Sequence, residues 1–191
     1  MSEVKNILLC GVGGQGTILA SKILSEALVE AGYDVKMSEI HGMSQRGGSV
    51  TTQVRYGEKV YSPIIGKGSA DILVAFEAME ALRYLGELNP KGQVVVNDFK
   101  MQTATTITGQ QNYPEDSIER VSSLADTKVL NAAKIAEDLG NPRAMNIVLL
   151  GALVKLMNLQ GLNWEGAISA CVKPAFIELN KKALEAGIQA V

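Results

Sequence analysis

The chain has 191 residues, of which 47% are hydrophobic and 20% are charged, and its formal net charge is -2. This length suits one folded domain, so we expect a single domain over residues 1–191. The near balance of 18 basic and 20 acidic residues provides no positive field for a nucleic acid or an anionic lipid surface, so neither is expected as a partner.

Cysteine usage and hydropathy indicate a cytoplasmic protein. Cys10 and Cys171 are the only cysteines, which is too few for a disulfide framework and suits a reducing compartment. The most apolar stretch, 147–154, is far shorter than the roughly 20 residues that a membrane-spanning helix needs, and the first residues lack a signal-peptide pattern. We therefore expect a cytoplasmic location.

The first 40 residues have the pattern of a strand, a glycine-rich turn, a helix and a second strand. Val4 to Cys10 is an apolar run typical of a buried strand, and an apolar stripe at spacings of three and four follows from Leu19 to Ala31. Gly32 is a natural helix stop before the next strand, Val35 to Ile40. A right-handed crossover between these strands predicts a parallel pair and a Rossmann-like start.

The next segment departs from a plain nucleotide-binding fold. From Val50 to Tyr56, apolar or threonine positions alternate with Thr51, Gln53 and Arg55, which predicts a strand with two different faces. Gly57-Glu58-Lys59 is a plausible turn before a β-rich run over 60–65. We therefore predict a β-hairpin insertion and a mixed, mostly parallel sheet.

Alternating strands and helices continue after the hairpin. We expect an irregular, threonine-rich loop or strand over 100–112, and the overall fold class is α/β, a three-layer α/β/α arrangement with a helical C-terminal third. The expected strands are 71–76, 93–97 (after a turn at 89–92) and 127–130, and the expected helices are 77–85, 115–124, 132–139, 144–158, 164–172 and 175–186.

The helix expected around Ile147 to Val154 is apolar on every side. Such a helix is buried in the core or against another subunit. Gly151 would permit close packing of a neighbouring element.

The turn after the first strand can carry chemistry. Gly11, Gly13 and Gly16 satisfy G-x-G-x-x-G between a predicted strand and helix, where a phosphate can approach backbone N–H groups at the positive helix end. Glu39 lies about 20 residues further on, where a dinucleotide-binding fold has its ribose-binding acid. Taken alone, this pattern favours NAD or FAD.

Two observations count against that interpretation. Gly14 and Gln15 make the turn richer in glycine and amide than the dinucleotide fingerprint demands, which suits close approach by another backbone. After Glu39 the chain enters the predicted hairpin and not a second crossover helix. A tight turn that serves packing alone is the plainer alternative.

The loop Ser44-Gln45-Arg46-Gly47-Gly48 is the second constellation, and it combines a hydroxyl, an amide, a fixed positive charge and a flexible backbone. Such a loop suits an anion. Arg46 can bind a carboxylate or a phosphate through two hydrogen bonds, although a solvated or ion-paired arginine is the common alternative.

Other reactive residue types carry less weight. His41 is the only histidine, so a metal site or a Ser-His-Asp arrangement is difficult to build, and we expect neither a metal site nor a catalytic residue in this chain alone. Cys10 is more often a small buried apolar residue. Glu77 and Asn97-Asp98 follow predicted strands, yet capping explains them equally well.

Two N-terminal motifs carry a family resemblance: Gly11-Val12-Gly13-Gly14-Gln15-Gly16 and the residues from Ser38 to Gly48. Together they resemble the gamma-type domain of the pyruvate/2-oxoacid:ferredoxin oxidoreductase family, and within it the chains of indolepyruvate oxidoreductases. The resemblance extends through 70–77, 139–141 and 146–153, so it covers nearly the whole chain.

This resemblance implies coenzyme A-dependent oxidative decarboxylation of an aryl 2-oxoacid such as indolepyruvate, with thiamine diphosphate, magnesium and iron-sulfur clusters passing electrons to ferredoxin. Two cysteines cannot provide the usual four thiolates of one cluster, and no Gly-Asp-Gly segment for a magnesium diphosphate is found. The resemblance therefore implies a non-autonomous subunit of a heteromer, in which a large partner holds these cofactors and coenzyme A is a co-substrate.

The resemblance also suggests that the turn at 11–16 and the loop at 44–48 face that partner. The anion at Arg46 is then a 2-oxoacid carboxylate, a coenzyme A phosphate or an acidic side chain of the partner, and the sequence leaves these open. The alternatives to the whole interpretation are a free-standing NAD(P)- or FAD-binding Rossmann-like protein and a plain interaction module.

Overall fold

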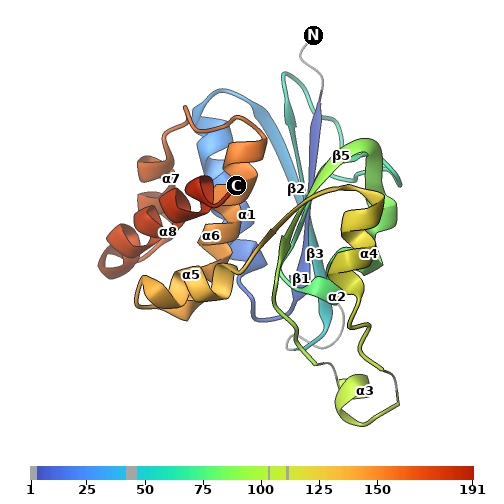
Figure 1. Ribbon diagram of the computed structural model, residues 1–191. Helices are drawn as coiled ribbons and strands as arrows, with labels where there is room; N and C mark the ends of the chain where they lie inside the picture. Colours follow the sequence, from blue (N-terminus) through green and yellow to red (C-terminus); the bar gives the residue numbers. More distant parts are fainter. Residues whose placement is uncertain (1–3, 42–46, 103, 111) are drawn as a thin grey trace.

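The computed structural model describes residues 4–41, 47–102, 104–110 and 112–191, and within them a six-stranded sheet forms the middle of three layers (Figure 1). Its strands are β1 (Lys5–Val12), β2 (Asp34–His41), β3 (Ser49–Gly57), β4 (Ala70–Ala75), β5 (Leu88–Asn97) and β6 (Asp126–Leu130).

The strand order is β2-β3-β1-β4-β5-β6. β1, β4, β5 and β6 run parallel, whereas β3 is antiparallel to both of its neighbours, β1 and β2. The prediction of a mixed, mostly parallel sheet is confirmed. The expected pairing of the first two strands is wrong, because β3 is inserted between them.

The predicted hairpin also has a different second strand. β3 pairs with β2, which precedes it, and residues 60–65 form no strand. Pro63 has no N–H group for a strand ladder. Instead, Arg55 donates from Nη1 to the carbonyl oxygens of Ser62 and Ile64, at 2.9 and 3.1 Å. This segment is therefore held by side chains of the sheet.

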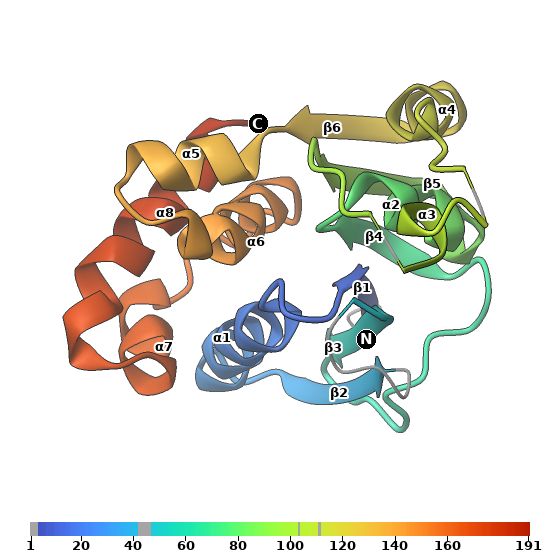
Figure 2. The same cartoon turned by 90° about the horizontal axis from the view of Figure 1, so that it is seen from below.

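Helices cover both faces of the sheet and give each face its own apolar core (Figure 2). The helices α1, α5, α6, α7 and α8 lie on one face, and α2 and α4 lie on the other. The helices are α1 (Thr17–Glu30), α2 (Ala78–Tyr84), α3 (Ala104–Ile107), α4 (Ser117–Leu124), α5 (Ala132–Asp138), α6 (Met145–Leu156), α7 (Trp164–Cys171) and α8 (Ile177–Gln189), with 3-10 turns η1 (Leu85–Glu87), η2 (Pro142–Ala144) and η3 (Pro174–Phe176).

The three-layer architecture and the helical C-terminal third are confirmed, and two local expectations need correction. β5 begins at Leu88, so the expected turn at 89–92 lies inside a strand whose register against β4 is irregular. Residues 100–112, expected to be a loop or irregular strand, contain the short helix α3.

The most apolar helix, α6, is buried from Asn146 to Val154. It packs against the sheet on one side and against α8 on the other. Gly151 faces Gly187 of α8, and a Cβ at either position would overlap backbone of the opposite helix. The close packing predicted for Gly151 is thus confirmed, and its neighbour belongs to the same chain. In the described part of the chain, no helix has the length and apolar character needed to cross a membrane.

Candidate functional site

The glycine-rich turn lies where β1 ends and α1 begins, and packing or backbone conformation requires glycine at three of its positions. A Cβ on Gly11 would lie 2.7 Å from Oε1 of Gln15 and 2.9 Å from Cβ of Phe76, so only glycine fits there. Gly14 and Gly16 have φ values of 103° and 80°, which residues with a side chain rarely adopt. The turn therefore requires glycine for packing and conformation, whatever it binds.

Gln15 points into the protein and fixes the turn. The residue is only 7% exposed. Oε1 accepts a hydrogen bond from the N–H of Val12 at 2.7 Å, and Nε2 donates to the carbonyl oxygen of Phe76 at 3.0 Å. The amide thus links the end of β1 to the residue after β4, and its polar atoms are used inside the fold.

A second buried amide extends this link to the next strand. Asn97, at the end of β5, donates from Nδ2 to the same Phe76 carbonyl at 3.2 Å and accepts from the N–H of Ala132 at 2.9 Å. Asn97 thus satisfies the N–H of the first residue of α5, whose N-cap is Asn131. Together the two amides join the carboxyl ends of β1, β4 and β5, the edge at which ligands bind in open α/β sheets.

The two predicted loops meet at Gly13. Its N–H donates to the carbonyl oxygen of Gly48 at 2.9 Å, and the N–H of Gly47 approaches the Gly13 carbonyl oxygen at 3.5 Å. The described end of the second loop, Gly47 and Gly48, thus lies against the glycine-rich turn. Ser44, Gln45 and Arg46 lie outside the described residues.

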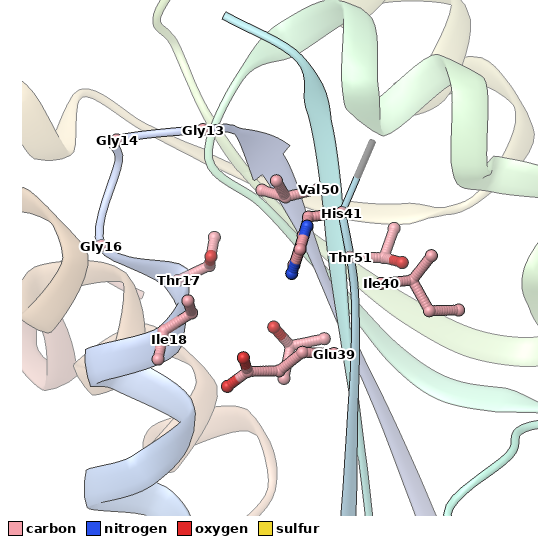
Figure 3. Close-up of a pocket in the computed structure, with 11 residues that line it drawn as sticks. Gly13, Gly14, Gly16, Thr17, Ile18, Glu39, Ile40, His41, Val50 and Thr51 are labelled. Carbon is pink, nitrogen blue, oxygen red and sulfur yellow. The ribbon is translucent and has the colours of Figure 1, made fainter. Parts of the chain in front are cut away.

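A cavity of about 440 Å³ opens between the start of α1 and strands β2 and β3 (Figure 3). Figure 3 shows Thr17 and Ile18 on the helix side, and the side chain of Glu39 extending from β2 towards them. The lining residues are Gly13, Gly14, Gly16, Thr17, Ile18, Glu39, Ile40, His41, Val50, Thr51 and Thr52.

The first turn of α1 gives this cavity its polarity. Gly16 is the N-cap and has no side chain that could satisfy the first N–H groups, and the first turn contains no acidic residue. These N–H groups and the helix dipole favour a negatively charged group. Glu39 and His41 stand opposite, and both are exposed. The arrangement offers binding groups of both signs, and the described residues that line it form no catalytic triad.

Two buried carboxylates near this edge were missed or left open by sequence reasoning. Glu77 caps α2 by accepting from the N–H of Glu80 at 3.0 Å, and it also accepts from the N–H of Met101 and the hydroxyl of Tyr113. Burial raises the pKa of the Tyr113 hydroxyl, and the hydrogen bond from this hydroxyl to Glu77 raises it further. Glu77 therefore anchors both ends of the 101–113 segment that contains α3.

Glu80 anchors the start of β3 in the same way. It is 1% exposed, accepts from the hydroxyl of Ser49, and pairs with Arg83 at 3.0 Å. Ser49 follows Gly48 directly, so this carboxylate fixes the described end of the second loop. The sequence signal is an acidic residue at the third position after the N-cap Glu77, as in a capping box.

Cys10 is not a nucleophile in this arrangement. It is fully buried, and its Sγ lies 3.6 Å from the carbonyl oxygen of Glu80. Burial, followed by the negative charges of Glu80 and Glu77, raises the pKa of its thiol well above the usual value. The expectation of a small buried residue is confirmed.

We expect Gln15→Leu to lower the free energy of unfolding by about 2 kcal/mol, because it leaves the buried N–H of Val12 without a partner while keeping a similar volume. Urea unfolding followed by circular dichroism measures this change. Gln160→Leu is the matched control, since Gln160 is exposed, and it should change the value by less than about 0.5 kcal/mol. Equal effects of the two substitutions would contradict the anchoring role of Gln15.

Comparison with known proteins decides the family. Residues 6–190 match the family described as pyruvate ferredoxin/flavodoxin oxidoreductase. The chain belongs to this family. It is 36% identical over 193 residues to the indolepyruvate oxidoreductase subunit IorB of Pyrococcus horikoshii, covering 97% of this chain and 95% of that one. The IorB subunit of Archaeoglobus fulgidus is 40% identical over 187 residues, with 95% and 92% covered.

A solved structure has the same fold over nearly the whole chain. The gamma subunit of a keto/oxoacid ferredoxin oxidoreductase from Geobacter sulfurreducens superposes with a TM-score of 0.72 at 27% identity, and 97% of each chain is covered. The sequence-based expectation of a gamma-type domain is confirmed.

The strand order of this chain also explains why the G-x-G-x-x-G pattern wrongly suggests a dinucleotide-binding fold. β3 lies between β1 and β2, so Glu39 is separated from the strand that carries the glycine-rich turn by two strand spacings, about 10 Å. In a dinucleotide-binding fold the corresponding acid is on the adjacent strand. Gly11, Gly13 and Gly16 thus reproduce the motif without its usual geometry.

Proposed function

We propose that this chain is a non-autonomous subunit of a 2-oxoacid:ferredoxin oxidoreductase that acts on indolepyruvate or a related aryl 2-oxoacid. The observation that carries the proposal is 36–40% identity to IorB subunits over nearly the full length of both chains. The alignments cover at least 92% of each of these relatives.

The cofactors of such an enzyme do not fit the residues of this chain. An iron-sulfur cluster takes four thiolates, and the sequence has two cysteines, of which Cys10 is fully buried. Among the residues that the structure describes, no group of three or more His, Cys, Asp or Glu side chains is placed to hold a metal ion. We therefore assign thiamine diphosphate, magnesium and the clusters to a larger partner subunit.

The contribution of this chain is a binding surface at the carboxyl edge of its sheet. In the proposed complex the turn at 11–16, the cavity beside it and the loop at 44–48 face the partner and help to hold the 2-oxoacid or coenzyme A. Support comes from the contact of Gly13 with Gly48 and from the uncapped start of α1. Arg46 supplies the positive charge of this loop. The cytoplasmic location stays a prediction from the sequence.

We expect the chain, tagged and purified from the cells that produce it, to bring down a larger cysteine-rich subunit that carries thiamine diphosphate and iron. Mass spectrometry identifies the partner, and metal analysis locates the iron. The tagged Gln160→Leu variant, purified in the same way, is the control for effects of handling. Purification of the chain without such a partner, at expression levels that maintain enzyme activity, would contradict the proposal.

A further inference from the structure

A second cavity, of about 310 Å³, lies on the helical face of the molecule and shares no lining residue with the first. It is enclosed by the beginnings of α6 and α8, the end of α7 and one side chain of α1, which all lie on the same face of the sheet (Figure 2). Nothing in the proposed function uses it.

Two buried asparagines present acceptor atoms to this cavity. Asn146 and Asn180 are 4% and 7% exposed. Each uses Nδ2 internally, Asn146 to the carbonyl oxygen of Gly16 at 3.1 Å and Asn180 to that of Phe176 at 2.7 Å. These bonds fix the orientation of both amides, so each Oδ1 is an acceptor for which the described residues provide no donor.

The two Oδ1 atoms must be accessible. In the described part of the chain, no fully buried side-chain oxygen or nitrogen lacks a hydrogen-bond partner. Since both asparagines line the cavity, it is the space into which these acceptors open. Buried amides with a free acceptor favour a ligand that carries N–H or O–H donors.

The rim of the cavity carries positive charge. Arg143 and Lys173 line it, both are exposed, and neither forms an ion pair with a described residue. None of the described residues that line the cavity is acidic. Two cations without counter-charges favour an anionic group at the rim.

The remaining wall is apolar. Phe176 is 46% exposed, and Val172 and Leu179 also line the cavity. We propose that this cavity binds a small organic anion, a carboxylate or a phosphate ester, whose apolar body lies against Phe176 and whose N–H or O–H donors reach Asn146 and Asn180. Arg143 and Lys173 hold its charge.

Cys171 provides a reporter inside the same cavity. It lines the wall, whereas the other cysteine, Cys10, is fully buried. Iodoacetamide should therefore modify Cys171 of the folded 191-residue chain far faster than Cys10, and mass spectrometry tells the two sites apart. A bound ligand covers the thiol, so the concentration that halves the alkylation rate measures affinity.

Two matched probes separate the possible sources of the anion. Indole-3-acetate and 3-indoxyl phosphate share a ring N–H donor and an apolar body but carry a carboxylate and a phosphate. The control compounds are acetate, sulfate and 1-methylindole-3-acetate, which all lack the ring N–H donor. We expect at least one of the two probes to protect Cys171 at a concentration at least tenfold lower than any of these controls requires. Whichever probe binds more tightly identifies the class of anion.

The double substitution Arg143→Gln and Lys173→Gln should lower the affinity for the protecting probe at least tenfold, because it removes both charged contacts to the anion. Both side chains are exposed, so their loss leaves the fold intact. Lys67→Gln, an exposed lysine elsewhere, should leave protection unchanged. Three outcomes would each overturn the assignment. They are no protection by either probe at millimolar concentration, equal protection by the donor-free anions, and wild-type protection in the double variant. None of these outcomes depends on a partner subunit, so the assignment fails or stands separately from the proposed oxidoreductase function.

Discussion

Gly151→Ala should lower the free energy of unfolding by at least ~2 kcal/mol, although alanine in a helix is intrinsically favoured over glycine by ~1 kcal/mol. The added Cβ would overlap the carbonyl oxygen of Leu184 and lie 2.9 Å from Cα of Gly187. Both are backbone atoms of α8, so relief requires the two helices to move apart and uncover a buried apolar face. Urea unfolding of the purified chain measures the loss.

The matched control is Gly86→Ala. Gly86 is exposed, and a Cβ there would meet nothing within 4 Å, so we expect a change of less than about 0.5 kcal/mol or a small gain. Gly187→Ala should behave like Gly151→Ala, because its Cβ would overlap the carbonyl oxygen of Val148. Near-neutral values for both α6 and α8 variants would contradict the close helix contact.

Arg46→Ala should leave the stability of the chain unchanged but lower kcat/KM of the assembled enzyme about tenfold to a hundredfold. This range corresponds to the loss of one charge-assisted contact to a carboxylate or phosphate, on the order of 1.5–3 kcal/mol. Steady-state kinetics with the 2-oxoacid and coenzyme A varied in turn shows which anion is affected.

Arg46→Lys should fall between wild type and alanine, because a point charge keeps the attraction and loses the planar fork of the guanidinium. Arg120→Ala is the matched control, since Arg120 is an exposed arginine of α4 on the opposite face of the sheet from α1. If Arg46→Ala assembles normally and turns over at the wild-type rate, Arg46 is a solvated loop residue and the proposed anion contact fails.

Local patterns in the sequence predicted most elements because their signals are local. The apolar run before Gly11 and the all-apolar stretch around Gly151 identify a buried strand and a buried helix, and both are present. Strand pairing was harder, because nothing in the βαβ pattern shows that a later strand will enter between the first two. The run at 60–65 was β-rich, but Arg55 binds its carbonyl groups and no ladder forms.

The candidate site was predictable in part for the same reason. Its glycines are visible in the sequence, whereas the partners that explain them come from distant segments, such as Phe76 for Gln15 and Gly48 for Gly13. Glu80 was missed because its burial depends on Ser49 and Arg83, and its own sequence neighbourhood is an ordinary helix start. The second cavity combines residues from α1, α6, α7 and α8 and left no continuous motif.

In the function that we propose, this chain works only as part of an oxidoreductase with a cofactor-bearing partner. The direct measurement is turnover of indolepyruvate, followed by reduction of ferredoxin in the presence of coenzyme A and thiamine diphosphate, for the chain alone, the partner alone and the two combined. We predict that the chain alone contains no iron and shows no turnover, and that adding it to the partner restores activity in proportion to the amount added. Turnover by the isolated chain, or full activity of the partner without it, would contradict the proposed function.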